Sequence, residues 1–237
     1  MSPSPQDWLD VEKLVKKIFE SVDWAKLGEI YFHEDGERQW QDRRKLVVEL
    51  GGQLARRLAL HVKPEGMSLW AGAGVAELPV MLAEVVLLNR TVVAANLLAE
   101  ECDVLNAALA EAAPHVALHF EAGDVLEVAG DQEFDHVGCI SLFTDPETWP
   151  LVSGVAYGRL HPVQLDLEQF AAERDQARAM AGNLLSLLTQ EACVTTTAEE
   201  VAWFLEFADE QGRVMEPADD LVETAVVGDP VGFLLLR

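Results

Sequence analysis

The pattern of apolar and polar positions changes character after the first quarter of the chain. Before that point, apolar residues recur at helical spacing and predict three helices, over 9–19, after a cap at Asp23, and over 37–60. The polar run Lys63-Pro64-Glu65-Gly66 ends this part. The pattern therefore predicts an N-terminal helical segment, residues 1–64, that precedes the main domain.

In the remaining residues, 65–237, short apolar runs alternate with helical patterns. Strands are predicted at 67–71, 91–95, 115–120, 134–142, 192–196, 224–227 and 231–236, and helices at 76–89, 97–112, 166–190 and from Thr197 to about Gly212. Alternating strands and helices with short loops imply right-handed crossovers and a parallel sheet. We expect an α/β protein with a Rossmann-like sheet of about seven strands that ends in an antiparallel hairpin.

The charge of the chain is strongly negative, with 17 Lys and Arg against 41 Asp and Glu and a net charge of -24. Such a surface repels phosphate backbones and anionic lipids. The expected partner is a small-molecule substrate, with no nucleic acid and no membrane, and a homodimer is allowed. The basic residues Arg43, Arg44, Lys45, Arg56 and Arg57 are interpreted as a solvated helix face.

Three widely spaced cysteines, without a CxxC pair or an N-terminal apolar signal segment, predict a reduced protein of the cytoplasm. Metal-site, nucleophile-elbow and phosphate-loop motifs such as HExxH, GxSxG and the P-loop are missing from the sequence. Any chemistry must therefore be sought where ligands bind in parallel sheets, beyond the carboxyl ends of the strands.

Three turns follow the first three predicted strands. Gly72-Ala73-Gly74 follows the first, and its glycines allow close approach of a ligand to the backbone. Asn96 follows the second, where it offers an amide oxygen to a ribose or caps the next helix. Gly123-Asp124-Val125 follows the third. Each turn alone also fits a plain structural role.

In this order, the three turns resemble the class I S-adenosylmethionine-dependent methyltransferase family over about residues 67–142. The resemblance implies S-adenosylmethionine as cofactor and a Rossmann-like methyltransferase sheet. It implies cofactor-binding residues at Trp70, Gly72, Gly74, Asn96, Asp124 and Val125. Trp70 and Asn96 stand where the family carries acidic residues.

Other roles are left open by the resemblance. Asp145, after the fourth predicted strand, is a candidate catalytic residue, although Asp145-Pro146 also has the form of a helix start. Tyr31 and Phe32 are candidate residues of a lid over the substrate, because N-terminal helices of this family often cover the active site. Packing between helices is the alternative for both.

Three functions remain in competition. The first is a methyltransferase acting on a small molecule. The second is a catalytically inactive binding or interaction protein on the same fold, suggested by the missing acids at Trp70 and Asn96. The third is a nicotinamide-dependent oxidoreductase, which is disfavoured because Glu77 stands at the third glycine of its motif and Asn96 at its acidic position.

Overall fold

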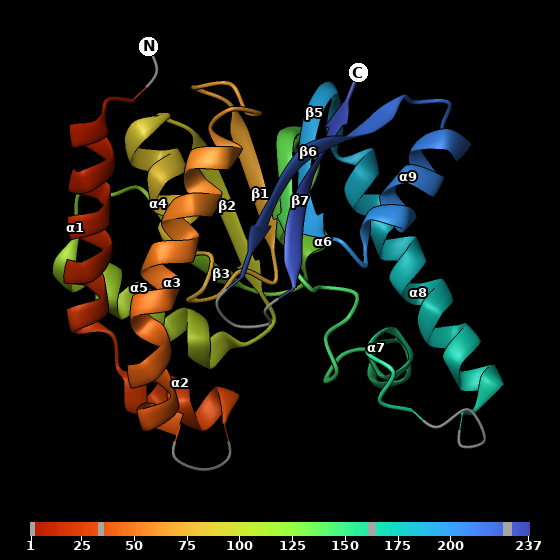
Figure 1. Ribbon diagram of the computed structural model, residues 1–237, viewed down its shortest axis with the longest axis horizontal. Coiled ribbons are helices and arrows are strands. Elements are labelled where there is room, and N and C mark those ends of the chain that lie inside the picture. The colour runs from red at the N-terminus through yellow and green to blue at the C-terminus, as the bar shows by residue number, and fades with distance from the viewer. Residues whose placement is uncertain (1–2, 33–35, 161–164, 225–228) are drawn as a thin grey trace.

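The computed structural model describes residues 3–32, 36–160, 165–224 and 229–237, which form a three-layer α/β structure around one seven-stranded sheet (Figure 1). The strands are β1 (Met67–Ala71), β2 (Thr91–Asn96), β3 (Phe120–Ala122), β4 (Phe134–Cys139), β5 (Leu188–Thr197), β6 (Met215–Glu223) and β7 (Pro230–Leu236). Their order is β3-β2-β1-β4-β5-β7-β6. Strands β1 to β5 are parallel, and β7 runs antiparallel between β5 and β6.

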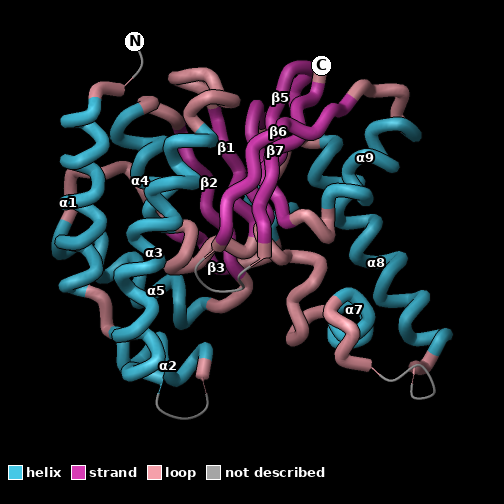
Figure 2. Tube along the Cα trace, in the orientation of Figure 1, coloured by secondary structure: helices cyan, strands magenta, loops and turns pink. Residues whose placement is uncertain are grey.

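Two helical layers cover the two faces of the sheet (Figure 2). The first consists of α1 (Pro5–Ser21), α2 (Trp24–Tyr31), α3 (Gly36–Leu58), α4 (Leu78–Leu87) and α5 (Ala99–Ala112). The second consists of α6 (Val125–Ala129), α7 (Pro150–Ala156), α8 (Leu167–Ser186) and α9 (Val201–Glu210). Trp70 packs in the first layer and its neighbours Leu69 and Ala71 in the second, as the alternation of a strand requires.

The N-terminal helices follow the predicted pattern closely. Ser4 and Asp7 form a capping box at the start of α1, and the Asp23 side chain accepts the Lys26 N–H at the start of α2. The apolar residues Val15 and Ile18 of α1 are buried against the rest of the first layer. Helices α1 and α3 both contact α4, so these helices share one hydrophobic core with the sheet.

Some predicted elements lie elsewhere in the structure. Strand β3 begins at Phe120, where the predicted strand ended, and β6 occupies Met215–Glu223 in place of 224–227, of which 225–227 lie outside the described residues. Helix α9 begins at Val201 and not near Thr197, because Thr197 still pairs with Val231 as the last residue of β5. The helix expected at Asp145 begins only at Pro150.

Both α2 and α7 lie at the edge of the sheet where β1 to β5 end, and the start of α1 and the end of β7 lie at the opposite edge (Figure 1). The carboxyl edge is therefore flanked by one short helix from each layer. The order of strands reverses between β1 and β4, which is the place where open parallel sheets bind ligands. Among the described residues, no helix has the length and apolar character needed to cross a membrane.

Candidate active site at the carboxyl edge of the sheet

The glycine turn after β1 lies at this reversal point. Gly72 has a φ of +68°, a left-handed conformation that favours glycine, and it is exposed. The Ala73 N–H donates to Ala95 O at 3.2 Å, which ties the turn to the end of β2. The Gly123 N–H donates to Asn96 O at 3.0 Å. The three turns that the sequence singled out therefore meet at one edge.

Asn96 organises this meeting with its side chain. Its Nδ2 donates to Ala73 O at 2.9 Å and to Glu101 Oε2 at 3.0 Å. Its Oδ1 accepts the Leu98 N–H at 2.9 Å. Asn96 is buried, and these contacts make it a brace between the glycine turn and the start of α5. A ribose that used its Oδ1 would share an oxygen already bonded to the backbone.

Glu101, in the first turn of α5, is a residue of this edge that the sequence did not single out. Its carboxylate is fully buried and accepts from the Tyr31 hydroxyl at 2.8 and 2.9 Å, and from the Val75 N–H at 3.1 Å. Burial raises the pKa of Glu101, and the hydrogen bonds from Tyr31, Val75 and Asn96 act against this rise. In the sequence, Glu101 lies in a Glu-rich segment that predicts the start of a helix and gives no sign of a functional role.

Glu77 places a second carboxylate beside the same turn. Its Oε2 accepts the Gly74 N–H at 2.9 Å. Burial raises the pKa of Glu77 to about 7, and the neighbouring Glu101 contributes to the rise. A Cβ added at Gly74 would lie 2.6 Å from Glu101 Oε1 and 2.8 Å from the Tyr31 hydroxyl. Residue 74 must therefore be a glycine, because a larger residue would collide with the side chains of Glu101 and Tyr31.

Tyr31 and Phe32 lie at the end of α2 in a cluster of aromatic rings. The Tyr31 ring meets Trp40 edge-on at 5.3 Å between centroids, and Phe32 meets Trp40 at 5.7 Å. Of these two residues, Tyr31 reaches the glycine turn, through its hydrogen bond to Glu101. The Arg43 guanidinium lies over the Phe32 ring at 5.0 Å. Tyr31 is therefore the lid candidate that touches the site, and Phe32 packs between α2 and α3.

Asp124 and Val125 follow β3 at the start of α6. Asp124 is the N-cap of this helix, and its Oδ1 accepts the Leu126 N–H at 2.8 Å. Its side chain is partly exposed, while Val125 is buried. Leu97, directly after Asn96, is 65% exposed. An apolar surface and a carboxylate oxygen thus stand on neighbouring turns at the ends of β2 and β3.

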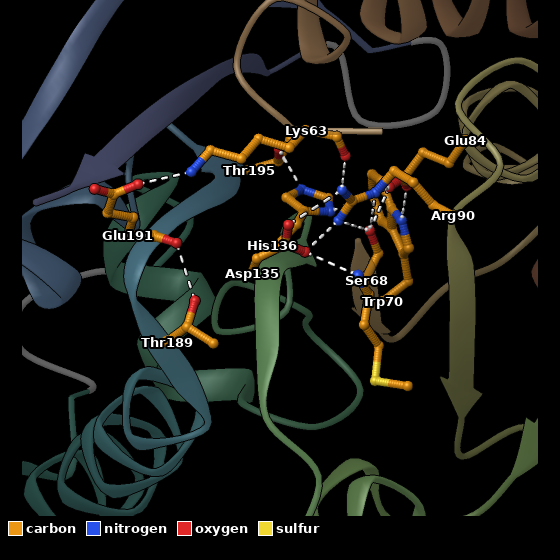
Figure 3. A network of polar contacts seen from close by, with 11 residues as sticks. Lys63, Ser68, Trp70, Glu84, Arg90, Asp135, His136, Thr189, Glu191 and Thr195 are labelled. Carbon is orange, nitrogen blue, oxygen red and sulfur yellow. Dashed lines mark hydrogen bonds and ion pairs between the residues drawn. The ribbon is translucent and has the colours of Figure 1, made fainter. Parts of the chain in front are cut away.

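Trp70 lies in the core and is fully buried (Figure 3). Its indole N–H donates to Glu84 Oε1 at 2.6 Å, and its ring meets His136 edge-on at 5.3 Å. Glu84 also pairs with Arg90, at 3.0 Å, and accepts from the Ser68 hydroxyl. Burial works against ionisation of Glu84, but His136, Ser68 and Arg90 together hold its pKa below the ordinary value.

This network places Trp70 in a structural role. The rest of it reaches toward the start of β4, where Asp135 accepts the Met67 N–H at 2.9 Å and bonds to Arg90. A Cβ at Gly138 of β4 would lie 2.3 Å from the Trp70 ring. The indole therefore fills the space between β1, β4 and α4, and the position at which the family resemblance expects a carboxylate carries a core residue.

On the β4 side of the reversal point, the side chains of Asp145 and Glu200 accept hydrogen bonds from the loop that follows β4. Asp145 is half-buried and accepts the Thr148 N–H at 3.1 Å, so its oxygens cap a turn. Glu200 is fully buried and accepts from the Phe143 N–H and the Thr196 hydroxyl, both at 2.7 Å. Burial raises the pKa of Glu200 to about 7. The sequence marked Glu200 only as part of a capping box.

Several solved structures are similar to this chain in their fold. LaPhzM superposes with a TM-score of 0.50 over 87% of this chain, at 12% identity. TrmN from Thermus thermophilus matches 81% of the chain at 16% identity and a TM-score of 0.49. A SAM-dependent O-methyltransferase from Thermotoga maritima matches 78% at 14% identity and a TM-score of 0.46. No family model matches, and neither does any curated protein.

The mixed seven-stranded sheet of this chain, in which β7 runs antiparallel between β5 and β6, matches the Rossmann-like fold of methyltransferase structures. The protein has the class I methyltransferase fold. The chain spans 61% of LaPhzM, 49% of TrmN and 63% of the Thermotoga protein, so each of the three is longer than this chain.

One expectation from the sequence is wrong. Proteins with the class I methyltransferase fold that match this chain include the transfer-RNA methyltransferases TrmN, Trm5b and TYW2, which contradicts the expectation of a small-molecule substrate and no nucleic acid. That expectation rested on net charge, but the charge is unevenly distributed. Residues 1–63 contain 11 Lys and Arg and 11 Asp and Glu, so this part is neutral. A net charge therefore does not describe every surface of the molecule.

Proposed function

We propose that this protein is an S-adenosylmethionine-dependent methyltransferase that binds its cofactor over the carboxyl ends of β1, β2 and β3. The observation that carries the proposal is the meeting of three turns at the reversal point of the sheet. Gly72 is exposed and left-handed, and the turn before Asp124 is bonded to the end of β2 through Gly123 and Asn96. This is the place where ligands bind in open parallel sheets.

The residues at this edge suit the chemistry of the cofactor. Leu97 offers an exposed apolar surface to an adenine ring, and Asp124 offers a carboxylate oxygen to an exocyclic amino group. A Cβ at Gly72 would meet only Leu142 within 4 Å, so the space beside Gly72 is not filled by backbone. S-adenosylmethionine carries a positive sulfonium, and the carboxylates of Glu77 and Glu101 lie at the glycine turn.

Methyl transfer requires little acid–base catalysis from the protein. The cofactor, when bound, supplies an electrophilic methyl group, and the protein positions the acceptor in line with it. Asp145 lies half-buried after β4, and its carboxylate accepts hydrogen bonds from Thr148 of its own turn. We assign the main work of the site to orientation of the two ligands, with Tyr31 closing the α2 side through its contact to Glu101.

The test of this function uses two helix caps. Asp124→Ala removes the cap of α6 and the proposed adenine contact, whereas Asp166→Ala removes only the cap of α8, at a site remote from the glycine turn. We expect Asp124→Ala to weaken S-adenosylmethionine binding at least about tenfold, equivalent to about 1.4 kcal/mol, and Asp166→Ala to leave it unchanged. Equal affinities in the two variants would remove Asp124 from the site.

A second function, that of a binding protein without catalysis, is favoured by one observation. The Gly74 and Val75 N–H groups, which a ligand could use, are already bonded to Glu77 and Glu101. An acceptor screen with S-adenosylmethionine, covering transfer RNA, protein extracts and small molecules, separates the two functions. Turnover with any acceptor excludes the inactive protein.

A further inference from the structure

Two carboxylates, the buried one of Glu101 and the half-buried one of Glu77, lie at the glycine turn without a basic partner. Among the described residues, neither Glu77 nor Glu101 forms an ion pair with a Lys, Arg or His. Their hydrogen-bond donors are neutral: the Gly74 and Val75 N–H groups, Asn96 and the Tyr31 hydroxyl. The buried Glu84 differs, since it pairs with Arg90.

A buried carboxylate without a cation is costly, because the protein interior screens its charge weakly. The cost is larger here, since Glu77 and Glu101 flank the same three-residue turn and repel each other. A positive charge that arrives beside the turn lowers the energy of both carboxylates at once. A ligand that carries such a charge therefore gains binding energy that a neutral analogue does not.

The Glu101 carboxylate does not lie free to touch the ligand directly. Glu101 is fully buried behind Gly74, and its oxygens are occupied by Tyr31, Val75 and Asn96. The influence of Glu101 is therefore that of a negative charge behind the turn, held in place by Tyr31 of α2 and by its own helix α5. The field of this charge selects among ligands by charge and leaves their shape to other residues.

We propose that Glu101 and Glu77 make the glycine turn selective for a positively charged ligand, so that the site binds the sulfonium of S-adenosylmethionine in preference to the neutral thioether of S-adenosylhomocysteine. This proposal rests on the proposed function, because it concerns the same site. It adds that the acidic charge missing at Trp70 and Asn96 is supplied from the other side of the turn.

The experiment compares three ligands by calorimetric titration of the intact protein. S-adenosylmethionine carries a sulfonium, sinefungin carries an ammonium group in place of the methylated sulfur, and S-adenosylhomocysteine is neutral there. We expect the two charged ligands to bind at least about tenfold more tightly than the neutral one. Sinefungin separates the effect of charge from that of the methyl group.

Three variants assign the selectivity to its source. The titrations are made at pH 8, because the pKa of Glu77 is about 7. Glu101→Gln and Glu77→Gln each remove one carboxyl group and are expected to reduce the preference to about threefold or less, mainly by weakening binding of the charged ligands. Tyr31→Phe removes a hydrogen bond but keeps the Glu101 charge, so the preference should persist. Glu133→Gln removes an exposed charge before β4, at the opposite edge, and serves as the control.

The outcomes separate this proposal from the function on which it rests. If none of the three ligands binds, the proposed function fails and the selectivity fails with it. If all three bind with equal affinity, or if both Gln variants keep the wild-type preference, the cofactor site stands and the charge selectivity is overturned. Glu77→Gln keeps the test open should Glu101→Gln not fold.

Discussion

The Tyr31 hydroxyl of α2 donates to the Glu101 carboxylate of α5, at 2.8 Å from one oxygen and 2.9 Å from the other. The two residues are 70 positions apart in the chain. Through Glu101 the contact extends to the Val75 N–H and to Asn96, so an N-terminal helix is bonded to the glycine turn of the sheet. Movement of α2 and the geometry of the turn are therefore linked.

Loss of this hydroxyl should destabilise the fold. In Tyr31→Phe the buried Glu101 keeps only its Val75 and Asn96 donors, and we expect the free energy of unfolding to fall by about 1.5–3 kcal/mol, as for hydrogen bonds to charged groups. Tyr157→Phe is the matched control, since its hydroxyl contacts Asp229 at a partly exposed site. Urea denaturation measures both, and an equal cost in the two variants would contradict the account.

Gly72 should be needed for both backbone geometry and ligand binding. Gly72→Ala places a Cβ at a φ of +68° and 3.1 Å from Leu142, and we expect it to cost about 1 kcal/mol of stability. It should also weaken S-adenosylmethionine binding at least about tenfold. Gly212→Ala has a φ of +67° in open space, so it should show a similar strain with unchanged ligand affinity. Matching affinities would place Gly72 outside the site.

Trp70 should matter for stability and not for the cofactor. Trp70→Phe removes the N–H that reaches Glu84 and leaves a buried carboxylate oxygen with one donor fewer. We expect a loss of about 2–4 kcal/mol in the free energy of unfolding. Trp149→Phe, whose indole donates to the neutral Leu142 O at 3.1 Å, should cost less. A large loss of cofactor affinity in folded Trp70→Phe would return this residue to the binding site.

Much of the fold follows from the apolar pattern. Strands β1, β2 and β4 and the helices α1 to α3 lie where the pattern places them, because their apolar residues are buried on a period set by the element. Strand β7, at Pro230–Leu236, has the same origin. The turns at Gly72 and Gly123 follow as well, since glycine marks backbone that other residues rarely adopt.

Elements decided by distant contacts could not be predicted in this way. Phe120, predicted to end a strand, begins β3, with its N–H and C=O both bonded to the Asn106 side chain of α5 at 2.8 Å. Strand β6 forms from an acidic segment containing Pro217 because apolar β7 offers it an edge. Glu200 was expected to cap a helix, but its carboxylate instead accepts the N–H of Phe143, 57 residues away.

The candidate site divides in the same manner. Asp124 and the glycine turn could be predicted, because they follow strands whose carboxyl ends must meet at one edge. Glu101 could not, since its partners Val75 and Tyr31 are 26 and 70 residues away and nothing in its local sequence distinguishes it from a helical surface Glu.

Stability should depend on pH through Glu200. Burial raises its pKa to about 7 from the ordinary 4.5, so the folded protein holds this proton more tightly than the unfolded chain between those values. The free energy of unfolding should therefore fall as pH rises through this window, by up to about 1.4 kcal/mol per pH unit for this group. Glu77 acts in the same direction.

Glu200→Gln removes this dependence, so its stability profile between pH 5 and pH 8 should be flatter than that of the wild type, by urea denaturation at each pH. Glu199→Gln, which removes the exposed neighbouring charge, should leave the slope unchanged. Parallel profiles for the wild type and Glu200→Gln would show that this carboxyl does not titrate in the window.

Calorimetric titration of S-adenosylmethionine into the purified protein tests the central claim most directly. The account predicts one site per chain with a dissociation constant on the order of 10 µM, in the range of ordinary enzyme–substrate affinities. Absence of binding heat at about 1 mM ligand, where a weak site of about −4 kcal/mol would be half filled, would contradict it. The class I methyltransferase fold would then serve a function without this cofactor.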